Sequence, residues 1–469
     1  MANKTIIKKS LKEIEDFARE WENALSDTNL KKFIKSGYEF NSKDKGWLGN
    51  LIQSEIFKIP VNSRPEPDFD EYGIELKVSG LIPTNDNTSF TAKERLVFSA
   101  INYETLVNQQ DIYESDFLKK NKYILLVFYK YDNNFKTKNY RAIKLISTRL
   151  IDLTQLEEFE QIKRDYETVV KLVKEGKAEE ISSSLTKYLE ACTKGQNANS
   201  LRVQPFSDVK AKARAWAFKN KLLTKIFYNT WKKYEFKNYD SIQDVISEIL
   251  KYQGRTLKSL YEEFDIKNTN GKSSRSSVIK AILKIKRFDE IKILATEQIT
   301  LKTINLEKNG MSLIEHSPIT PIRIEDFNEE QKFEDSDLYN ICSSGMLVVV
   351  FKKEKDKAKI ESTILQDCFM LNFDNDEIKT IKSVYYKTMD LCNNGVVYRE
   401  INPDKKRRKT YLVHESDNQV IHIRPKAKDS KETYQTKNGQ IITKISFSLN
   451  HKTIEQKYQN YLKNKKRAE

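Results

Sequence analysis

The feature that most constrains this fold is a weak internal repeat. Four segments of the first half recur, in the same order and at similar spacing, in the second half. One match could arise by chance because apolar strands resemble one another, but four in register favour a duplicated domain. We therefore expect two tandem domains of one fold, residues 1–235 and 236–469. The matched segments are 44–52 with 270–283, 74–81 with 299–306, 124–132 with 346–356, and 200–208 with 420–429.

The hydrophobic pattern predicts an α/β fold, with a mixed β-sheet flanked by helices in each domain. GIELKVS (73–79) alternates between apolar and polar residues, and YILLVFYKY (123–131) is a nearly continuous apolar run, so both are expected to be strands. Ser10 begins a Ser-x-x-Glu capping box, which predicts the start of a helix. Helices are also expected in TAKERLVFSAINYETL (91–106) and in the charged region 155–190.

The charge balance favours a polyanionic partner. The chain has 82 Lys and Arg residues against 67 Asp and Glu residues, a formal net charge of +15. A protein with this excess is attracted to nucleic acid. The alternative is a generally basic surface that serves solubility.

Cysteines and histidines exclude several classes of site. The four cysteines form no CxxC pair and are too few for a disulfide framework, which is typical of a reducing compartment. All four histidines lie in the second half, so the first half cannot use a His-metal nuclease site. No long apolar segment predicts a signal peptide or a membrane span. We expect a soluble, cytoplasmic protein with no membrane partner.

Two carboxylates and a lysine form the candidate catalytic group. Side chains alternate along a strand, so Glu75 and Lys77 share one face, roughly 7 Å apart, while Leu76 faces the core. Asp68 follows Pro67 and can reach the same face if the chain folds back as a hairpin.

This group suits phosphodiester hydrolysis. Two carboxylates can hold a hard divalent cation, to which the Leu76 carbonyl could add a further oxygen. Such a cation lowers the pKa of a bound water, and Lys77 could orient that water and stabilise the phosphorane charge. The alternative is an amphipathic strand with a solvated Glu–Lys face, because PD…ExK is a short motif.

Several segments resemble a known nuclease family. KGWLG, SRPEPDF, GIELK and IRPKA resemble MutH, the strand-nicking endonuclease of mismatch repair. The chain is more similar to the two-domain type II restriction endonucleases that cut GATC, through almost its whole length. The segments that carry this second resemblance are KERLVFSAINYE (93–104), FLKKNKYILLVFY (117–129), YLEACTKG (188–195) and SLRVQPFSDVKAKARAWAFKNKLLT (200–224).

The resemblance implies two MutH-like domains of the PD-(D/E)xK fold and Mg²⁺-dependent cleavage. Asp68, Glu75 and Lys77 fall on the family's catalytic triad, with Asp68, Glu75 and the Leu76 carbonyl as metal ligands. Lys120 falls on a further active-site lysine, and only the alignment favours it over Lys119 and Lys122. The family usually has a glutamate on the preceding helix where this chain has Gln53, and Glu55 lies on another side of that helix.

The resemblance also implies DNA-reading residues. In the first domain the matching positions are Arg202, Gln204 and Lys219, since Arg can bond guanine and Gln can bond adenine in bidentate fashion. Arg214, with Lys210 and Lys212, is expected to contact phosphates, and Trp216 and Phe218 are interleaved with these cations. For each one taken singly, the alternative is a solvated basic residue.

The second domain retains a reading motif and loses a catalytic one. Arg424, Pro425 and Lys426 match the family's DNA-reading loop, whereas Thr300 stands where Glu75 is expected. The resemblance implies a non-catalytic effector domain that binds a second GATC site. The basic run 405–409 is either a phosphate-contacting hairpin or a solvated loop.

The leading hypothesis is a type II restriction endonuclease that makes Mg²⁺-dependent double-strand breaks at GATC. The alternatives are a MutH-type nicking endonuclease and a non-catalytic, sequence-specific DNA-binding protein. The expected partner is double-stranded DNA, bound by a monomer or a DNA-induced dimer. A cognate methyltransferase would be a functional partner, not a physical one.

Overall fold

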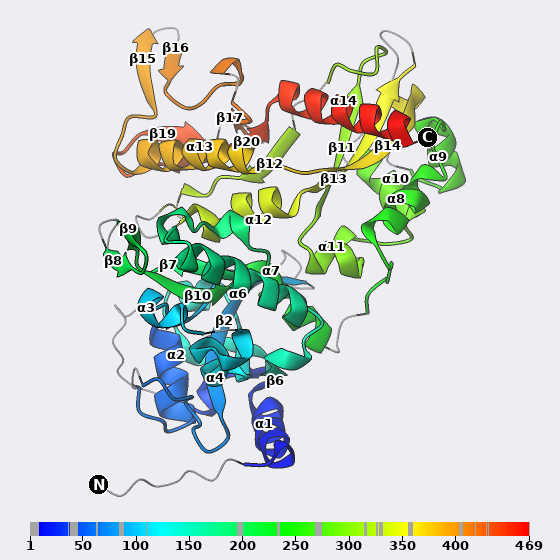
Figure 1. The fold of residues 1–469 in the computed structure, drawn as a ribbon. Helices are drawn as coiled ribbons and strands as arrows, with labels where there is room; N and C mark the ends of the chain where they lie inside the picture. Colours follow the sequence, from blue (N-terminus) through cyan, green and yellow to red (C-terminus); the bar gives the residue numbers. More distant parts are fainter. Residues whose placement is uncertain are drawn as a thin grey trace, which may run out of the picture. The chain divides into compact units, whose positions relative to one another are not determined.

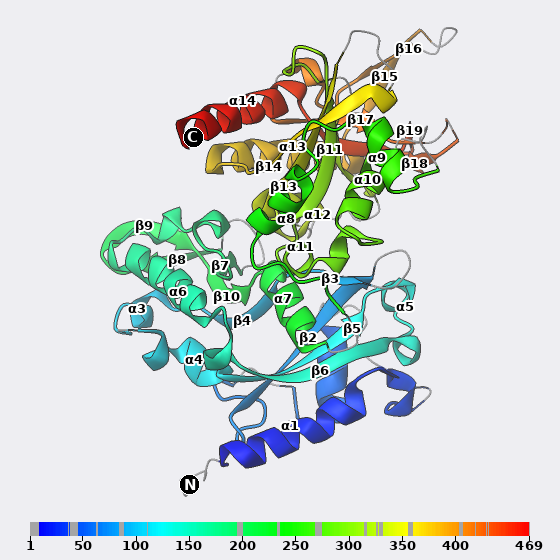
Figure 2. The ribbon, with the colours of Figure 1, turned by 90° about the vertical axis from the view of Figure 1, so that its right-hand side faces the viewer.

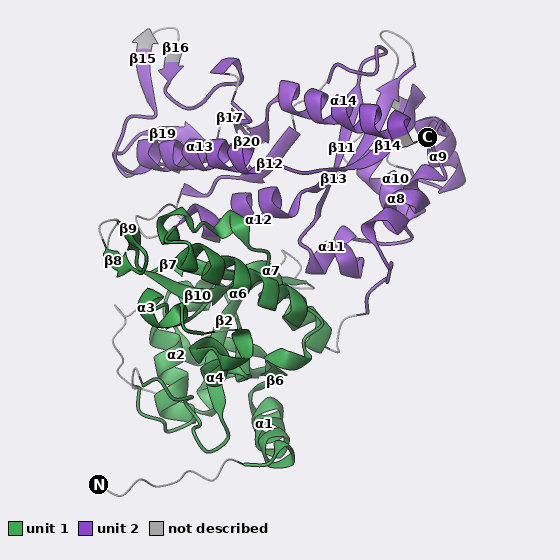
Figure 3. Ribbon diagram, viewed as in Figure 1, with its two compact units in different colours: residues 1–234 green, residues 235–469 purple. Residues whose placement is uncertain are grey.

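The chain forms two compact units, residues 1–234 and 235–469, which Figure 3 distinguishes by colour. The computed structural model describes residues 9–468 except 36, 38–45, 62–63, 84–88, 110, 195–199, 232–234, 268–273, 314–316, 325–326, 328–331, 355–359, 403–406, 418, 428 and 430. Within this part, no helix is both long and apolar enough to cross a bilayer.

The first unit is built from two larger β-sheets, a separate two-stranded hairpin and the helices around them (Figure 1). Its helices are α1 (Leu11–Leu25), α2 (Trp47–Leu51), α3 (Tyr103–Leu106), α4 (Asp116–Asn121), α5 (Asn133–Lys136), α6 (Phe159–Lys174) and α7 (Asn220–Thr230). Its strands are β1 (Thr28–Asn29), β2 (Ile74–Pro83), β3 (Phe90–Ala92), β4 (Leu96–Ala100), β5 (Tyr123–Lys130), β6 (Lys144–Asp152), β7 (Leu189–Thr193), β8 (Leu201–Gln204), β9 (Ser207–Lys212) and β10 (Arg214–Phe218).

The large sheet of the first unit has the order β1-β6-β5-β2-β3, with β2 parallel to β5 and β5 antiparallel to β6. Figure 2 shows α1 on one side of this sheet and α7 on the other. Leu76 and Leu125 belong to the core on the α1 side, whereas Phe128 packs against Phe227 of α7 at 5.3 Å between ring centroids. The predicted mixed sheet flanked by helices is confirmed.

The second unit has a similar set of elements. Its helices are α8 (Ile242–Leu250), α9 (Leu257–Glu263), α10 (Ser274–Ile282), α11 (Lys292–Thr296), α12 (Asp337–Ser344), α13 (Asn375–Asn393) and α14 (His451–Ala468). Its strands are β11 (Thr300–Leu306), β12 (Ser317–Pro321), β13 (Met346–Lys353), β14 (Thr363–Leu371), β15 (Tyr398–Asn402), β16 (Arg407–Thr410), β17 (Ile421–Pro425), β18 (Thr433–Gln435), β19 (Ile441–Thr443) and β20 (Ile445–Leu449).

The two units share one strand plan. β11, β13 and β14 pair as β2, β5 and β6 do, and a register shift follows Phe128 in β5 and Val350 in β13. In the smaller sheets, β10 lies antiparallel between β4 and β7, as β20 does between β12 and β17. The shared order and the shared register shift support a duplicated domain.

The fourth predicted match between the two halves is wrong. The N–H of Lys194 after β7 donates to the Ala213 carbonyl at 2.8 Å, and the N–H of Lys426 after β17 donates to the Lys444 carbonyl at 2.7 Å. The counterpart of β17 is therefore β7, not β8. The β8–β9 hairpin corresponds instead to β18–β19, which is likewise inserted before the central strand of its sheet. Two short apolar strands near a basic segment cannot be told apart by residue type alone.

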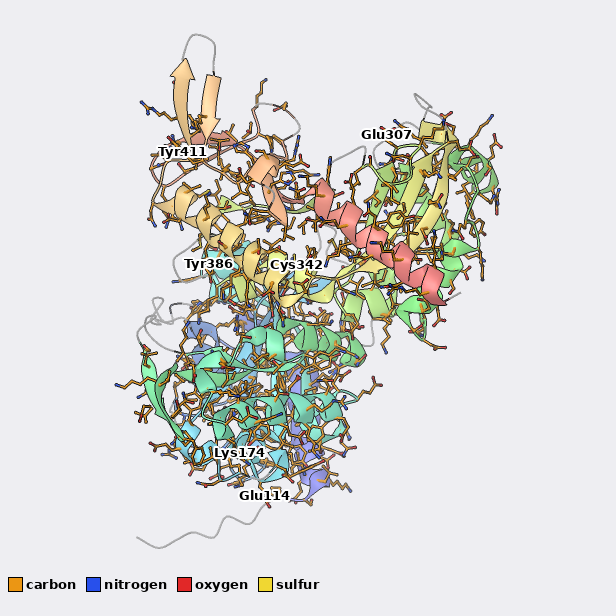
Figure 4. The ribbon with its side chains drawn as sticks, turned by 45° about the horizontal axis from the view of Figure 1, so that its top comes forward. Glu114, Lys174, Glu307, Cys342, Tyr386 and Tyr411 are labelled. Carbon is orange, nitrogen blue, oxygen red and sulfur yellow. The ribbon has the colours of Figure 1, made fainter. Side chains whose placement is uncertain are left out.

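The remaining predictions of local structure have mixed outcomes. The capping box of Ser10 and Glu13 is present at the start of α1. The expected helix over 91–106 is wrong except at Tyr103–Leu106, because 91–92 belong to β3 and Leu96 and Phe98 alternate into the core along β4. The four cysteines are free and buried; Figure 4 labels Cys342, on α12.

One buried carboxylate ties α6 to the start of β7. Asp165 is 2% exposed and accepts hydrogen bonds from the N–H groups of Lys187, Tyr188 and Leu189 at 2.9, 2.5 and 2.9 Å. Gln161 also donates to this carboxylate, at 2.9 Å. Asp165 thus satisfies backbone donors that would otherwise be buried without partners.

Replacing Asp165 should destabilise the first unit strongly. Asp165→Ala leaves buried N–H groups without an acceptor, so we expect the free energy of unfolding to fall by about 3 kcal/mol. Urea denaturation followed by circular dichroism measures the change. The control is Asp16→Ala on the exposed face of α1, expected to cost less than about 0.5 kcal/mol. Equal effects of the two changes would contradict the anchoring role.

Candidate active site

A fold-back of the chain brings the two predicted carboxylates together. Phe69 and Ile74 form an antiparallel bridge, in which the Phe69 N–H donates to the Ile74 carbonyl at 2.9 Å. Gly73 makes the turn with φ +65°, a conformation that side chains other than glycine rarely adopt. Asp68 precedes this bridge and Glu75 follows it, and the Asp68 N–H donates to Oε2 of Glu75 at 3.2 Å.

The Asp68 carboxylate is held from two sides. Its Oδ2 accepts from the N–H of Leu76 at 3.0 Å, and its Oδ1 accepts from Nε2 of Gln53 at 3.1 Å. Gln53 lies in a π-helical turn, Ile52–Ile56, that continues α2. Glu55, in the same turn, forms an ion pair with Lys58 at 3.6 Å. Gln53 is therefore the side chain of this turn that bonds Asp68.

Glu75 is buried and receives two ammonium groups. The residue is 3% exposed, and its Oε1 lies 2.6 Å from Nζ of Lys77 and 3.8 Å from Nζ of Lys120. Burial raises the pKa of Glu75, the two lysines oppose that shift, and the nearby Asp68 adds to it. The fold thus holds a carboxylate pair in a place where ionisation is costly.

Lys120 is distinguished from its neighbours by where α4 places it. Its Nζ donates to the carbonyl of Arg64 at 2.7 Å while it faces Glu75. Lys119 instead pairs with Asp116 at 3.9 Å and is 65% exposed, and Lys122 lies over the ring of Tyr123. Of these three lysines, Lys120 is the one that contacts the carboxylate pair.

The alternative of a solvated Glu–Lys face is wrong. The second sheet covers this side of β2, because Nζ of Lys77 lies 5.8 Å from the ring centroid of Phe98 on β4. Phe98 in turn packs edge-on against Phe218 of β10, with centroids 4.8 Å apart. The side chains of Glu75 and Lys77 therefore lie between the backbone of β2 and the aromatic side chains of the second sheet.

The donor atoms at this site fit a hard cation with an incomplete protein shell. Asp68 and Glu75 supply carboxylate oxygens, and the Leu76 carbonyl lies on the same strand edge as the N–H that faces Asp68. Among the described residues there is no cluster of three or more acidic, His or Cys side chains that could hold a metal. Mg²⁺ suits such a site, because it commonly binds through one or two carboxylates and retains several waters.

Gln204 does not lie where a base-reading residue would. It is 3% exposed, its Nε2 donates to Glu179 and to the Val209 carbonyl at 2.6 Å each, and its Oε1 accepts from the Ala178 N–H at 2.8 Å. An amide used in this way has no edge left for adenine, which contradicts the prediction. Arg202, in the same strand, is exposed and remains a candidate.

Arg214 and Lys219 are also engaged by the protein itself. Arg214 is 7% exposed, and its Nη1 donates to the Ala191 carbonyl at 2.6 Å. Lys219 donates to the carbonyls of Ser183 and Thr186. Burial lowers the pKa of both cations. The structure contradicts their predicted contacts with DNA, because their donors already bind carbonyls of β7 and of the segment before it.

Trp216 and Phe218 are core residues, not DNA-stacking residues. They are 3% and 1% exposed, and Trp216 stacks on Tyr166 of α6 with centroids 5.0 Å apart. Among the cations of this segment, Lys210 and Lys212 are exposed. All five residues of β10 are buried, so the exposed cations of this segment lie on the preceding hairpin.

In the second unit, Arg424 and Lys426 occupy accessible positions at the end of β17. Arg424 is half-buried and lines a cavity of about 510 Å³, together with His422 and Tyr398, and Lys426 is exposed. The predicted basic run 405–409 lies partly outside the described residues, and its hairpin is seen only as β15 and β16.

The paired strands identify a residue that the sequence comparison missed. Since β7 is the counterpart of β17, Lys194 is the counterpart of Lys426, and Cys192 occupies the position that Arg424 has in the second unit. Lys194 is exposed. The segment YLEACTKG (188–195) contains this lysine, but the Arg202 segment resembles the reading loop of the second unit more closely in sequence.

The second unit lacks both carboxylates. The shared register makes Thr300 the counterpart of Glu75. Glu75 pairs with Ile124, four residues before the last residue ahead of the register shift in β5, and Thr300 pairs with Met346, which has the same place in β13. The Ile299 N–H donates to the Leu294 carbonyl at 2.9 Å, as the Ile74 N–H donates to the Phe69 carbonyl, so Ile293 stands where Asp68 would be.

A lysine remains at the corresponding site of the second unit. Lys302 is the counterpart of Lys77 and donates to the Pro318 carbonyl at 2.9 Å. Burial, with a smaller effect from Lys426, lowers the pKa of Lys302 to about 8. A site with an isoleucine, a threonine and a lysine has no oxygen pair to hold a divalent cation.

Comparison with known proteins identifies relatives of both the whole chain and the first unit. The type II restriction enzyme Sau3AI of Staphylococcus aureus is 30% identical over 421 residues, which cover 83% of each chain. A family described as DNA mismatch repair enzyme MutH matches residues 57–165. The DNA mismatch repair proteins MutH of Shewanella woodyi and of Actinobacillus pleuropneumoniae serotype 5b are 26% and 28% identical over 34% of this chain, and these matches cover 64% and 66% of those proteins.

Gln53 allows a test of the metal site. Gln53→Glu would place a third carboxylate beside Asp68, so the metal-free protein should be less stable and the apparent affinity for Mg²⁺ should rise about tenfold. Thermal unfolding during a Mg²⁺ titration measures both effects. Glu55→Gln, in the same turn, is the control and should leave both unchanged. An unchanged Mg²⁺ response in Gln53→Glu would place the ion elsewhere.

Proposed function

This chain belongs to the family of the type II restriction enzyme Sau3AI, and from that membership and its active-site geometry we propose that it cuts both strands of DNA at GATC with Mg²⁺ as cofactor. It is a site-specific deoxyribonuclease. The observation that carries the proposal is the fold-back that sets Asp68 against Glu75, with Nζ of Lys77 2.6 Å from Oε1 of Glu75.

Each residue of the site has a proposed role. Asp68, Glu75 and the Leu76 carbonyl would hold the metal, which when bound polarises the scissile phosphate and activates a water. Lys77 would orient that water and donate to the oxygen on which negative charge develops. Lys120 would keep a second positive charge beside the phosphate and Glu75. The covering rings, such as Phe98, exclude water and so strengthen these interactions.

We propose that the second unit binds DNA without cutting it and acts as an effector. Ile293 and Thr300 replace the carboxylates, whereas Arg424 and Lys426 keep the guanidinium and ammonium groups of the reading loop. In the first unit, Lys194 and Arg202 are the proposed DNA contacts. We expect a monomer or a DNA-induced dimer, with a cognate methyltransferase that protects host GATC sites.

Digestion of plasmid DNA tests the activity. Purified protein with Mg²⁺ should convert a plasmid with GATC sites into fragments whose ends map to GATC, and a plasmid without these sites should stay intact. Asp68→Ala should lower the rate by at least about 10³-fold, because the metal loses a main ligand. Nicked circles would instead indicate a repair-type nickase, and an intact plasmid would indicate a non-catalytic binding protein.

Two-site kinetics test the effector role. Arg424→Ala should weaken the rate advantage of a plasmid with two GATC sites over one with a single site, and Thr300→Glu should create no new cleavage, because Ile293 still replaces the other carboxylate. The control is Lys379→Ala, which removes one exposed charge from α13. An unchanged two-site advantage in Arg424→Ala, equal to that of the control, would refute the role.

A further inference from the structure

The turn of the β8–β9 hairpin carries an aromatic side chain in a costly conformation. Gln204 and Ser207 pair across a two-residue loop, Pro205-Phe206, and Phe206 has φ +64°. This position of a tight turn favours glycine or asparagine. The other described non-glycine residues with positive φ are Asp, Lys or Gln. Phe206 is nonetheless 75% exposed, so its ring gains little from the core of its own chain.

The hairpin is held firmly beneath this ring. Two hydrogen bonds of Gln204 tie it to Ala178 and Glu179, and a third, to the Val209 carbonyl, joins the two strands of the hairpin. Gly176, with φ +67°, lies so close that a Cβ there would be 2.6 Å from the Phe206 carbonyl oxygen. The protein therefore fixes the backbone of the turn and leaves its aromatic side chain in water. Strain of this kind, at an exposed apolar residue, indicates a binding role.

The surface of the hairpin combines apolar and cationic side chains. Leu201 and Lys212 stand directly opposite each other, and both are exposed. The further exposed side chains are those of Arg202, Val203, Asp208, Val209 and Lys210. Three cations against one acid favour a polyanion. In Figures 1 and 2 the hairpin lies at the margin of the first unit.

The hairpin is linked to the active site through β10. β9 ends at Lys212 and β10 begins at Arg214, and Phe218 at the far end of β10 packs on Phe98. Phe98 is the ring next to Nζ of Lys77. DNA bound by the hairpin would thus be held by the same sheet that covers the catalytic residues.

We propose that the β8–β9 hairpin enters the major groove of the DNA and that Phe206 contacts the C5-methyl group of thymine. A two-stranded ribbon fits the major groove, and the thymine methyl is the apolar group exposed there. Lys210 and Lys212 bind the flanking phosphates. This inference rests on the proposed function, because it assigns thymine recognition within the DNA site to a residue outside the catalytic group.

Phe206→Gly separates the role of the ring from its conformation. Glycine suits φ +64°, so thermal stability should be unchanged or higher, whereas the affinity for a GATC duplex should fall at least about tenfold. Fluorescence anisotropy without divalent ions measures binding across a salt series. The slope of log K against log salt should stay unchanged in Phe206→Gly and should fall by about one in Lys210→Ala.

Thymine itself is tested with a duplex that carries uracil at the thymine positions of GATC. Loss of the methyl should weaken binding by the wild-type protein and should weaken Phe206→Gly no further. Phe206→Leu, which keeps apolar bulk, should retain most of the discrimination, and Leu11→Ala, an exposed change on α1, should behave as wild type.

Equal sensitivity to uracil in wild type and Phe206→Gly would overturn the thymine contact, and unchanged affinity in Phe206→Gly would overturn the role of the ring. Failure of the wild-type protein to prefer GATC over a scrambled duplex would instead refute the proposed function.

Discussion

The fold-back between Phe69 and Ile74 is the constraint on which the site depends. It places Asp68 against the N–H of Leu76 and sets the start of β2, from which Glu75 and Lys77 project. The second unit preserves the corresponding backbone hydrogen bond, with Gln298 at φ +53° in place of Gly73. The same backbone geometry thus supports a carboxylate pair in one unit and apolar and hydroxyl side chains in the other. The backbone turn is thus common to both units, and the side chains placed on it decide whether a pair of carboxylates is present.

The carboxylate pair illustrates a conflict between stability and function. Glu75 is buried beside Asp68, and its pKa is raised, so its charged form costs free energy in the folded protein. Lys77 and Lys120 offset part of that cost, and in the proposed reaction they would also supply positive charge beside the phosphate. Replacement of the carboxylates by Ile293 and Thr300 removes this cost from the second unit. The second unit therefore keeps the same strand plan without the cost of a buried carboxylate pair.

The sequence predicted the grouping of Asp68, Glu75 and Lys77 better than the exposure of the residues expected to read DNA, for a physical reason. Alternation along one strand fixes which side of the strand Glu75, Leu76 and Lys77 face, and no distant segment can change that. By contrast, the roles of Gln204, Arg214 and Lys219 depend on what packs over them. Glu179 accepts from Gln204, the Ala191 carbonyl of β7 accepts from Arg214, and the Ser183 carbonyl before β7 accepts from Lys219. The sequence alone does not show whether a basic residue is buried. It therefore favours Arg214, which is buried, as a DNA contact over Lys194, which is exposed.

The sequence by itself determined the fold class, the duplicated domain and the membership of the family, because these follow from the periodicity and the order of many residues along the chain. It also determined that only the first copy carries the Asp68, Glu75 and Lys77 combination. Tertiary structure decided which long-range partners each strand and side chain would have. It made β17 the equivalent of β7, set Gln53 against Asp68, and brought Lys120 rather than Lys119 to Glu75. It also left Phe206 exposed at a turn. Such contacts join residues far apart in the chain, and the free energy that selects them comes from burial and pairing that no local pattern contains.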